Sequence, residues 1–259
     1  MNILDTIVQE KRKSVVVQQS MVSLEMLKAS TFYNRTPFSL VKHIQENNEV
    51  GIIAEFKRKS PSKGNIYADA DVVQVTTAYQ SAQASAVSIL TDTDFFGGSN
   101  QDLIDARPLL KIPILRKDFI IDPYQIHEAK SIGADLILLI AACLTVEEVD
   151  EYAQLAKSLG MEVLLELHDE EELGHISPHV DLVGINNRSL KTFKVDIDRS
   201  LKMASLIPNN YLKVAESGID DPSLIRLFKK NGFQAFLIGE FFMKTHQPGQ
   251  ALADFIEKI

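Results

Sequence analysis

The sequence contains only one cysteine, Cys143, among its 259 residues. A disulfide needs two cysteines and most structural zinc sites need several, so an intrachain disulfide framework and a cysteine-rich zinc site are both excluded. Scarce cysteine is typical of proteins from a reducing compartment. We therefore predict a cytoplasmic location.

Long apolar segments are absent as well. The longest uninterrupted apolar run covers residues 136–144, whereas a membrane-spanning helix needs about 20 apolar residues. Near the N-terminus the basic cluster Lys11-Arg12-Lys13 follows the apolar residues, which is the reverse of a secretory signal. The sequence therefore predicts neither membrane insertion nor export.

An excess of positive charge is also missing. Lysine and arginine number 27, aspartate and glutamate number 35, and the net charge is −8, which argues against nucleic acid as a partner. There is no low-complexity tract and no linker rich in proline, glycine and serine. We expect one structural domain, with an N-terminal helical extension (residues 1–48) and a larger unit (residues 49–259). A monomer or a weak homo-oligomer is expected.

From Val50 onward, short β-rich runs alternate with amphipathic helical segments. The eight runs are residues 51–57, 86–90, 113–117, 135–140, 162–166, 181–186, 212–216 and 235–239. Eight strand–helix units predict a (β/α)8 barrel. A doubly wound sheet is the alternative, but its G-x-G-x-x-G turn is absent after the first run.

Several sequence signals predict where helices begin and end. Thr36-Pro37 precedes an apolar stripe in the N-terminal extension and predicts a helix start. Thr145 with Glu148 forms a capping box, and Gly160 is placed to end the same helix. Asp122-Pro123 and Asp221-Pro222 predict two further helix starts.

Polar residues stand at or just after the ends of the predicted strands, where barrel enzymes carry their chemistry. These residues are Glu55, Lys57, Lys117, Glu166, Asn186, Arg188 and Glu216. Each one alone could be the first solvated residue after a strand. Together they would place two amines and three carboxylates over one opening, where crowding and exclusion of water shift proton affinities. The pattern therefore indicates acid–base catalysis.

Glycine turns after the last two strands indicate an anion site. Ser217-Gly218 and Gly239-Glu240 could offer backbone amides to a phosphate, with the Glu240 side chain turned away, or they could be ordinary turns. The loop Ser60-Pro61-Ser62-Lys63-Gly64 is polar and basic. It could cover an anionic substrate or simply be solvated, and it lacks the spacing of a Walker loop.

Other candidates carry weaker signals. His168 lies on the same side of its strand as the carboxylate two residues earlier and could titrate, but an ordinary loop histidine is favoured. His175 and His179 are separated by four positions with a proline between them, so a helical metal pair is not favoured. Cys143 is interpreted as a packing residue. Phe95-Phe96 could stack on a ring-bearing substrate or pack in the interior.

The order of these motifs resembles that of the indole-3-glycerol phosphate synthase family from about residue 36 to the end. The matching segments are residues 53–64, 90–92, 95–99, 115–119, 165–168, 184–188 and 215–219. One departure is Phe241-Phe242, where relatives often have smaller residues.

The resemblance implies a (β/α)8 barrel whose N-terminal helical segment contributes to the substrate site. It also implies closure of 1-(2-carboxyphenylamino)-1-deoxyribulose 5-phosphate to indole-3-glycerol phosphate, without a cofactor or metal. The family's acid–base positions fall on Glu55, Lys57, Lys117, Glu166, Asn186, Glu216 and Ser217. Substrate or phosphate contacts are expected from Ser60, Arg188, Gly218, Gly239 and Glu240.

Within that reaction we expect Lys117 to protonate the ketone oxygen and Glu166 to act as the base of the dehydration. Lys57 would orient the substrate carboxylate or act in the later step. Two alternatives differ in activity. A phosphoribosylanthranilate isomerase would be a shorter barrel, and a barrel that only binds a phosphorylated ligand would not need both lysines and the glutamate.

Overall fold

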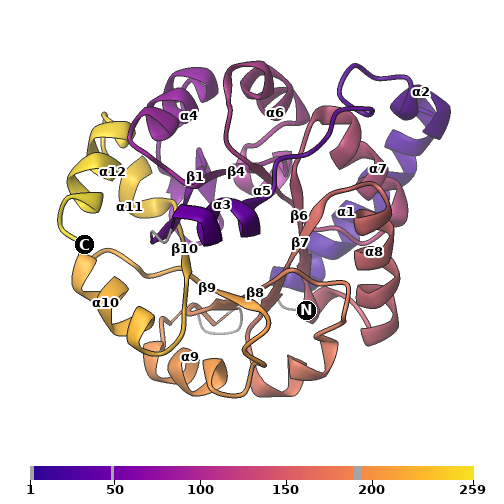
Figure 1. The fold of residues 1–259 in the computed structure, drawn as a ribbon. Coiled ribbons are helices and arrows are strands. Elements are labelled where there is room, and N and C mark those ends of the chain that lie inside the picture. Colours follow the sequence, from indigo (N-terminus) through magenta and orange to yellow (C-terminus); the bar gives the residue numbers. More distant parts are fainter. Residues whose placement is uncertain (1–2, 48–49, 190–193) are drawn as a thin grey trace.

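The computed structural model describes residues 3–47, 50–189 and 194–259. Eight parallel strands close into a barrel, in which β1 pairs with both β4 and β10 (Figure 1). The strands are β1 (Gly51–Phe56), β4 (Ala86–Leu90), β5 (Ile114–Lys117), β6 (Leu136–Ile140), β7 (Glu162–Leu167), β8 (Leu182–Asn186), β9 (Leu212–Glu216) and β10 (Ala235–Ile238). The predicted (β/α)8 barrel is confirmed. Two short strands, β2 (Lys59–Ser60) and β3 (Gly64–Asn65), form a separate hairpin after β1.

Helices surround the ring of strands. They are α4 (Val72–Ser81), α5 (Thr93–Phe96), α6 (Asn100–Ala106), α7 (Pro123–Ile132), α8 (Val146–Ser158), α9 (Ile197–Ala204), α10 (Pro222–Lys230), α11 (Glu240–Met243) and α12 (Pro248–Ile256). Single turns of 3₁₀ helix occur at η1 (Arg107–Leu109) and η2 (Ala141–Cys143), and a longer one at η3 (Glu170–His175). The predicted capping box of Thr145 and Glu148 is present, and Asp122 and Asp221 cap α7 and α10.

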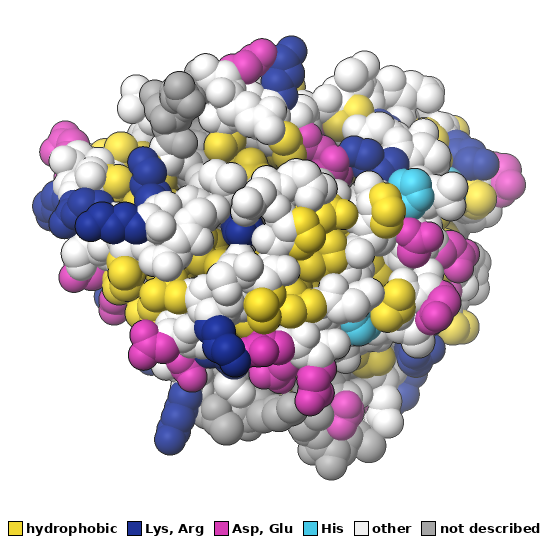
Figure 2. All heavy atoms as spheres, turned by 60° about the horizontal axis from the view of Figure 1, so that its bottom comes forward, with side chains coloured by type: hydrophobic (Ala, Val, Ile, Leu, Met, Phe, Trp, Pro, Cys, Tyr) yellow, Lys and Arg dark blue, Asp and Glu magenta, His cyan; other side chains and the backbone are white. Residues whose placement is uncertain are grey.

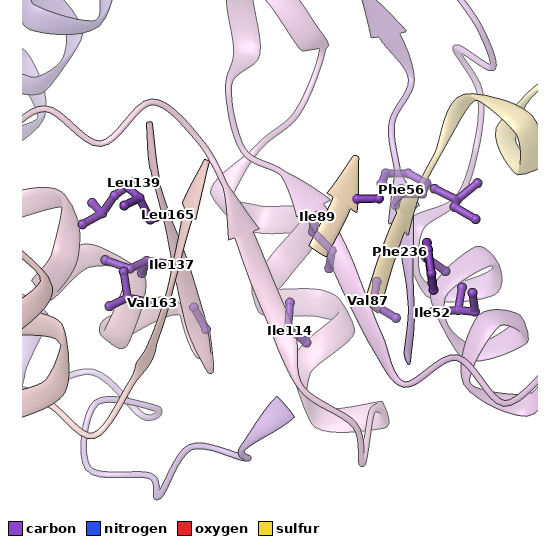
Figure 3. Packing of buried hydrophobic residues seen from close by; sticks show 14 of the residues in the cluster. Ile52, Phe56, Val87, Ile89, Ile114, Ile137, Leu139, Val163, Leu165 and Phe236 are labelled. Carbon is purple, nitrogen blue, oxygen red and sulfur yellow. The ribbon is translucent and has the colours of Figure 1, made fainter. Parts of the chain in front are cut away.

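Side chains along each strand alternate between the helices and the barrel interior, as the pleat of a strand requires. Figure 3 shows outward residues such as Ile52, Val87 and Val163, which pack in the layer between strands and helices. Inward residues such as Leu115 and Leu164 form a second, separate core inside the barrel. Because alternate residues share a face, the residue two positions after an inward leucine also points inward. The same alternation means that the polar side chains at the strand ends point into the mouth of the barrel.

Three helices precede the barrel: α1 (Ile3–Met21), α2 (Leu24–Lys28) and α3 (Leu40–Asn47). Helix α3 lies across the centre of the ring in Figure 1, and its Leu40 and Ile44 join the core inside the barrel. It therefore closes the end opposite the strand C-termini. The predicted boundary between residues 48 and 49 lies outside the described residues.

The predicted start of α3 at Thr36-Pro37 is wrong, because the helix begins at Leu40. The cause is a local cap together with a tertiary contact, since the Ser39 hydroxyl accepts a hydrogen bond from the Lys42 amide at 3.0 Å. Glu162, at the start of β7, accepts hydrogen bonds from the Leu40 and Val41 amides and from the Ser39 hydroxyl. A buried carboxylate from the barrel thus satisfies amides that a local cap would otherwise have to satisfy.

None of the helices among the described residues is long and apolar enough to span a membrane. On the face shown in Figure 2, basic and acidic side chains are interspersed around apolar atoms. That face carries no uniformly basic patch of the kind nucleic acid would require.

Candidate active site

All twelve residues predicted for the site surround one cavity of about 440 Å³ at the C-terminal end of the barrel. They are Glu55, Lys57, Ser60, Lys117, Glu166, Asn186, Arg188, Glu216, Ser217, Gly218, Gly239 and Glu240. This volume suits a small organic ligand. The structure thus brings the predicted residues together, while their individual roles stay predictions.

Lys117 is the central cation of the cavity. Its Nζ atom lies 3.2 Å from Glu166 Oε2 and 4.0 Å from Glu216 Oε2. Burial by itself would lower the pKa of Lys117, but the carboxylates of Glu166, Glu216 and Glu55 outweigh burial and raise that pKa above its ordinary value. Lys117 is therefore a charged donor that gives up its proton only when charge develops on a substrate oxygen.

Glu166 is the carboxylate best prepared to act as a base. It is buried, and its Oε1 atom accepts a hydrogen bond of 3.0 Å from Asn186 Nδ2. Burial tends to raise the pKa of Glu166, but the nearby Lys117 ammonium, the adjacent His168 ring and the Asn186 amide hold it well below the usual range. Glu166 is consequently ionised at neutral pH.

Glu216 has the opposite protonation tendency. It is 1% exposed, and burial together with the Glu166 and Glu55 carboxylates raises its pKa well above the usual range, against the pull of Lys117. Two carboxylates so close to one ammonium cannot both be stably ionised. A proton shared by this pair therefore favours Glu216 over Glu166.

Gly184 provides the space that Glu216 occupies. A Cβ atom at position 184 would overlap Glu216 Oε1. Position 184 in β8 must therefore be glycine, because the Glu216 carboxyl group from the neighbouring strand β9 fills the space that a side chain would need.

We expect Gly184→Ala to push Glu216 out of position and to lower kcat by about 10- to 100-fold, because a displacement of about 1 Å in a catalytic constellation is costly. Steady-state kinetics with matched circular dichroism spectra would test this. Gly174→Ala is the control, since a Cβ atom there has no neighbour within 4 Å. An unchanged kcat for Gly184→Ala would show that the position of Glu216 is unimportant.

Glu55 and Lys57 form a second pair on the opposite side of the mouth. Lys57 Nζ lies 2.6 Å from Glu55 Oε1, and both side chains come from the inward face of β1 and its extension. A Cβ atom at Gly239 would lie 2.5 Å from the same carboxylate oxygen. Each of these two buried carboxylates thus requires a glycine beside it, which is Gly184 in β8 for Glu216 and Gly239 just after β10 for Glu55.

The anion end of the cavity is built from the turn after β9. Ser217 and Gly218 both adopt left-handed backbone angles, with φ of 66° and 67°. For serine this conformation costs roughly 1 kcal/mol. The strained turn is held by buried Asn187, whose Nδ2 donates to the Ser217 carbonyl at 2.8 Å. The sequence analysis missed Asn187, and its position beside Asn186 gives no signal that separates it from a surface residue.

The expected orientation of Glu240 is wrong. Its carboxylate is not turned away from the basic groups, because its oxygens lie 3.6 Å from Lys63 Nζ and 3.5 Å from Arg188 Nη2. The carboxylate thus occupies the cations that would otherwise be available to a phosphate. Lys63 belongs to the loop between β2 and β3, so this contact also joins the loop to the anion end.

An apolar wall faces the acid–base groups. Phe96 and Phe119 line the cavity with their ring centroids 6.0 Å apart. Leu4 and Ile7 of α1 line the same wall. Of the two aromatic residues singled out in the sequence, Phe96 thus faces the cavity, and the N-terminal extension contributes to it.

Lys11 is a second residue that the sequence analysis missed. Its ammonium lies 2.8 Å from Asp92 Oδ2 and 2.7 Å from Asp118 Oδ1, and its side chain is 11% exposed. Asp118 directly follows Lys117, so this contact fixes α1 to the loop that carries the central cation. The helical spacing of Leu4, Ile7 and Lys11 is the signal that could have placed all three on one face.

His168 follows β7 in a loop, but it is not an ordinary loop histidine. The ring is buried, and Nε2 lies 3.1 Å from Glu166 Oε1. The predicted position of His168 on the Glu166 side of the strand is thus confirmed, and the burial of its ring was not expected. Among the described residues, no group of three or more His, Cys, Asp or Glu side chains is arranged to hold a metal ion.

Comparison with known proteins agrees with this geometry. The family model for indole-3-glycerol phosphate synthase matches residues 4–255. The indole-3-glycerol phosphate synthase of Bacteroides thetaiotaomicron is 48% identical over 259 residues, covering 100% of this chain and 99% of that protein. The enzyme of the same name from Polynucleobacter asymbioticus is 41% identical over 262 residues, covering 98% of each chain.

Solved structures show the same fold at low sequence identity. Tryptophan synthase subunit alpha from Legionella pneumophila has a TM-score of 0.63 at 12% identity, over 85% of this chain and 96% of that one. Thiamine phosphate pyrophosphorylase from Pyrococcus furiosus has a TM-score of 0.60 at 14% identity, over 82% and 98% respectively. Similarity at this level supports the barrel and carries no argument about the reaction.

Proposed function

This chain belongs to the indole-3-glycerol phosphate synthase family, and from that premise we propose how its cavity performs the reaction. The substrate is 1-(2-carboxyphenylamino)-1-deoxyribulose 5-phosphate, and the product, indole-3-glycerol phosphate, serves tryptophan biosynthesis. The observation that carries the proposal is the contact of 3.2 Å between Lys117 and Glu166. This contact supports the proposal because a charged donor and an ionised acceptor meet at one point of the cavity.

The cavity is polar at one end and apolar along one wall, and this asymmetry orients the substrate. The phosphate binds the amides of the Ser217-Gly218 turn and Gly239, with Arg188 supplying positive charge. The carboxyphenyl ring then lies against the apolar wall of Phe96 and the α1 side chains. Lys57 faces the substrate carboxylate, which is bonded to the ring carbon that reacts, and so orients that carbon toward the ketone.

Ring closure forms the first new bond. The aromatic carbon that bears the carboxylate attacks the ketone carbon, and Lys117 delivers a proton to the ketone oxygen as negative charge develops there. The carbon–carbon bond to the carboxylate then breaks, carbon dioxide leaves, and its electron pair restores the aromatic ring. Closure of the cavity around the substrate favours these steps by holding the two carbons in contact.

Dehydration completes the indole. Glu166 removes a proton from the new five-membered ring while the hydroxyl group leaves as water after protonation by Lys57 or Lys117. Glu216 holds the proton that would otherwise neutralise Glu166, and Asn186 fixes the Glu166 carboxylate. Glu55 positions Lys57 through their contact of 2.6 Å.

Indole fluorescence tests the proposal directly, because the protein contains no tryptophan and any indole signal comes from product. Purified protein mixed with the carboxyphenylamino-deoxyribulose phosphate should give a fluorescence increase proportional to enzyme concentration. A phosphoribosylanthranilate isomerase would consume only phosphoribosylanthranilate, and a ligand-binding barrel would show saturable binding without turnover. Either result would refute the proposed reaction.

Glu240→Gln is expected to tighten the binding of inorganic phosphate, because the variant no longer places a carboxylate beside Arg188 and Lys63. Removal of one such charge is worth about 1 kcal/mol, which corresponds to about fivefold in the inhibition constant. Competitive inhibition by phosphate would measure it. Glu46→Gln is the matched control, since Glu46 pairs with Lys42 at the same 3.6 Å on α3. Equal inhibition constants in wild type and Glu240→Gln would contradict this account.

A cytoplasmic location and a monomeric or weakly associated state stay predictions. Cell fractionation tests the first, and sedimentation at micromolar concentration tests the second. That the reaction needs no cofactor and no metal is likewise a prediction. It is tested by measuring turnover after exhaustive treatment of the protein with a chelator.

A further inference from the structure

The side chain of His168 is buried beside the proposed base and is not used by the mechanism above. It is 3% exposed, and Nε2 lies 3.1 Å from Glu166 Oε1. Within the described part of the chain, neither ring nitrogen makes a well-directed hydrogen bond. A buried polar group without a good partner is rare, and such groups gather at functional sites.

Glu172 approaches His168 from the other side. Glu172 Oε2 accepts the His168 backbone N–H at 2.6 Å and lies 3.9 Å from ring atom Nδ1. Its side chain is 16% exposed, compared with 4% for His168 and 3% for Glu166. The imidazole therefore lies between a carboxylate near the surface and a carboxylate inside the cavity.

The groups facing this arrangement come from five elements of the barrel. They are Lys117 on β5, Glu216 on β9, Glu55 on β1, Cys143 at the end of η2 and Asp5 on α1. The Cys143 thiol stays neutral, because burial and the Glu166, Glu172 and Asp5 carboxylates raise its pKa to about 12. Of the five groups named here, Lys117 is the positively charged one, and it is also the cation nearest to Glu166 that the described residues provide.

We propose that His168 is a positioning residue that holds the Glu166 carboxylate for proton abstraction, and that Glu172 holds His168 in turn. In this arrangement Nε2 donates to Oε1, on the same oxygen as Asn186, while Oε2 stays directed at Lys117. Catalytic hydrogen bonds are often poorly aligned without substrate and tighten when it binds. The distance of 3.1 Å leaves Nε2 close enough to Oε1 to form this hydrogen bond after a small rotation of the ring. The inference rests on the proposed role of Glu166 as the base.

His168→Leu removes the donor, and His168→Gln keeps an amide that can donate to the same oxygen. We expect His168→Leu to lower kcat by about 10- to 100-fold, the effect of one charge-assisted hydrogen bond, with KM changed less than about twofold. With one donor fewer, the carboxylate binds its proton more tightly. The acidic limb of the kcat–pH profile should therefore move upward by about one pH unit. His168→Gln should recover most of kcat and return the limb toward its original position.

The control is His246→Leu, which removes an exposed histidine outside the cavity and should leave both quantities unchanged. If His168→Leu does not fold, His168→Gln is compared with His168→Asn instead. The asparagine side chain is shorter, so its amide does not reach Glu166 Oε1 and the donor is lost. The inference is overturned if His168→Leu and His168→Asn have the wild-type kcat and the wild-type position of the acidic limb. It is also overturned if His168→Gln loses as much kcat as these two variants.

Glu166→Gln separates this inference from the proposed function. If Glu166→Gln retains turnover, the proposed base is wrong whatever His168 does. If Glu166→Gln is inactive and His168→Leu behaves as wild type, only the role of His168 fails.

Discussion

Lys117→Met is expected to lower kcat by about 10²- to 10⁴-fold, the contribution of a positioned general acid. Methionine has nearly the length of lysine and no proton to donate, so the ketone oxygen would develop charge without a partner. The barrel should remain folded, because the proton held at Glu216 can be shared with Glu166 once the ammonium is gone. Single-turnover fluorescence, together with a thermal melt, measures both effects.

Lys229→Met provides the control for this result, since Lys229 lies exposed on α10 and should show wild-type kinetics. If Lys117→Met closes the ring at a rate near that of the wild type, Lys117 is not the acid. If the variant unfolds, the buried carboxylates need the ammonium for stability, and Lys117→Arg would restore the fold without restoring turnover.

Glu166→Gln and Glu216→Gln should differ by at least about 100-fold in kcat, although the two carboxylates lie in the same cavity. Glu166 is held ionised, and an amide in its place cannot accept a proton. Glu216 is held protonated, and a glutamine resembles the neutral acid in size and hydrogen bonding. We therefore expect Glu166→Gln to lose about 10³- to 10⁴-fold and Glu216→Gln to lose less than about tenfold.

The pH dependence of kcat adds a second measurement of this pair. The wild-type profile should fall on the acid side when Glu166 takes up a proton, at a pH kept low by the depressed pKa of that group. Glu216→Gln keeps a neutral group of similar size and hydrogen bonding beside Glu166, so the acidic limb should stay within about half a pH unit of its wild-type position. Equal losses of kcat in both glutamine variants would show that the two carboxylates are not distinguished by their protonation.

Much of the site could be predicted because the period of a strand is two. Leu115 points into the barrel, so Lys117 does as well, and Glu166 follows Leu164 in the same way. Parallel strands in a closed barrel end on one side. Alternation and topology together therefore bring residues from distant parts of the sequence to one opening before any contact is known.

Partners distant in sequence decided two of the outcomes that the sequence did not predict, and the local turn after β7 decided the third. Helix α3 begins at Leu40 because Glu162 caps it from β7. His168 is buried because the chain after β7 turns back through η3 and brings Glu172 against its backbone. Lys11 lies far from Asp118 in the sequence, and only the packing of α1 over the mouth reveals its two carboxylate partners.

The sequence by itself determined the barrel, the strands and the residues that converge on its mouth, because these depend on local periodicity and on the order of strands. Only the tertiary structure decided the opposite pKa shifts of the two central carboxylates, the partners of Lys11 and the orientation of Glu240. The physical reason is that proton affinity and pairing depend on burial and on distances of a few ångströms between segments far apart in the chain.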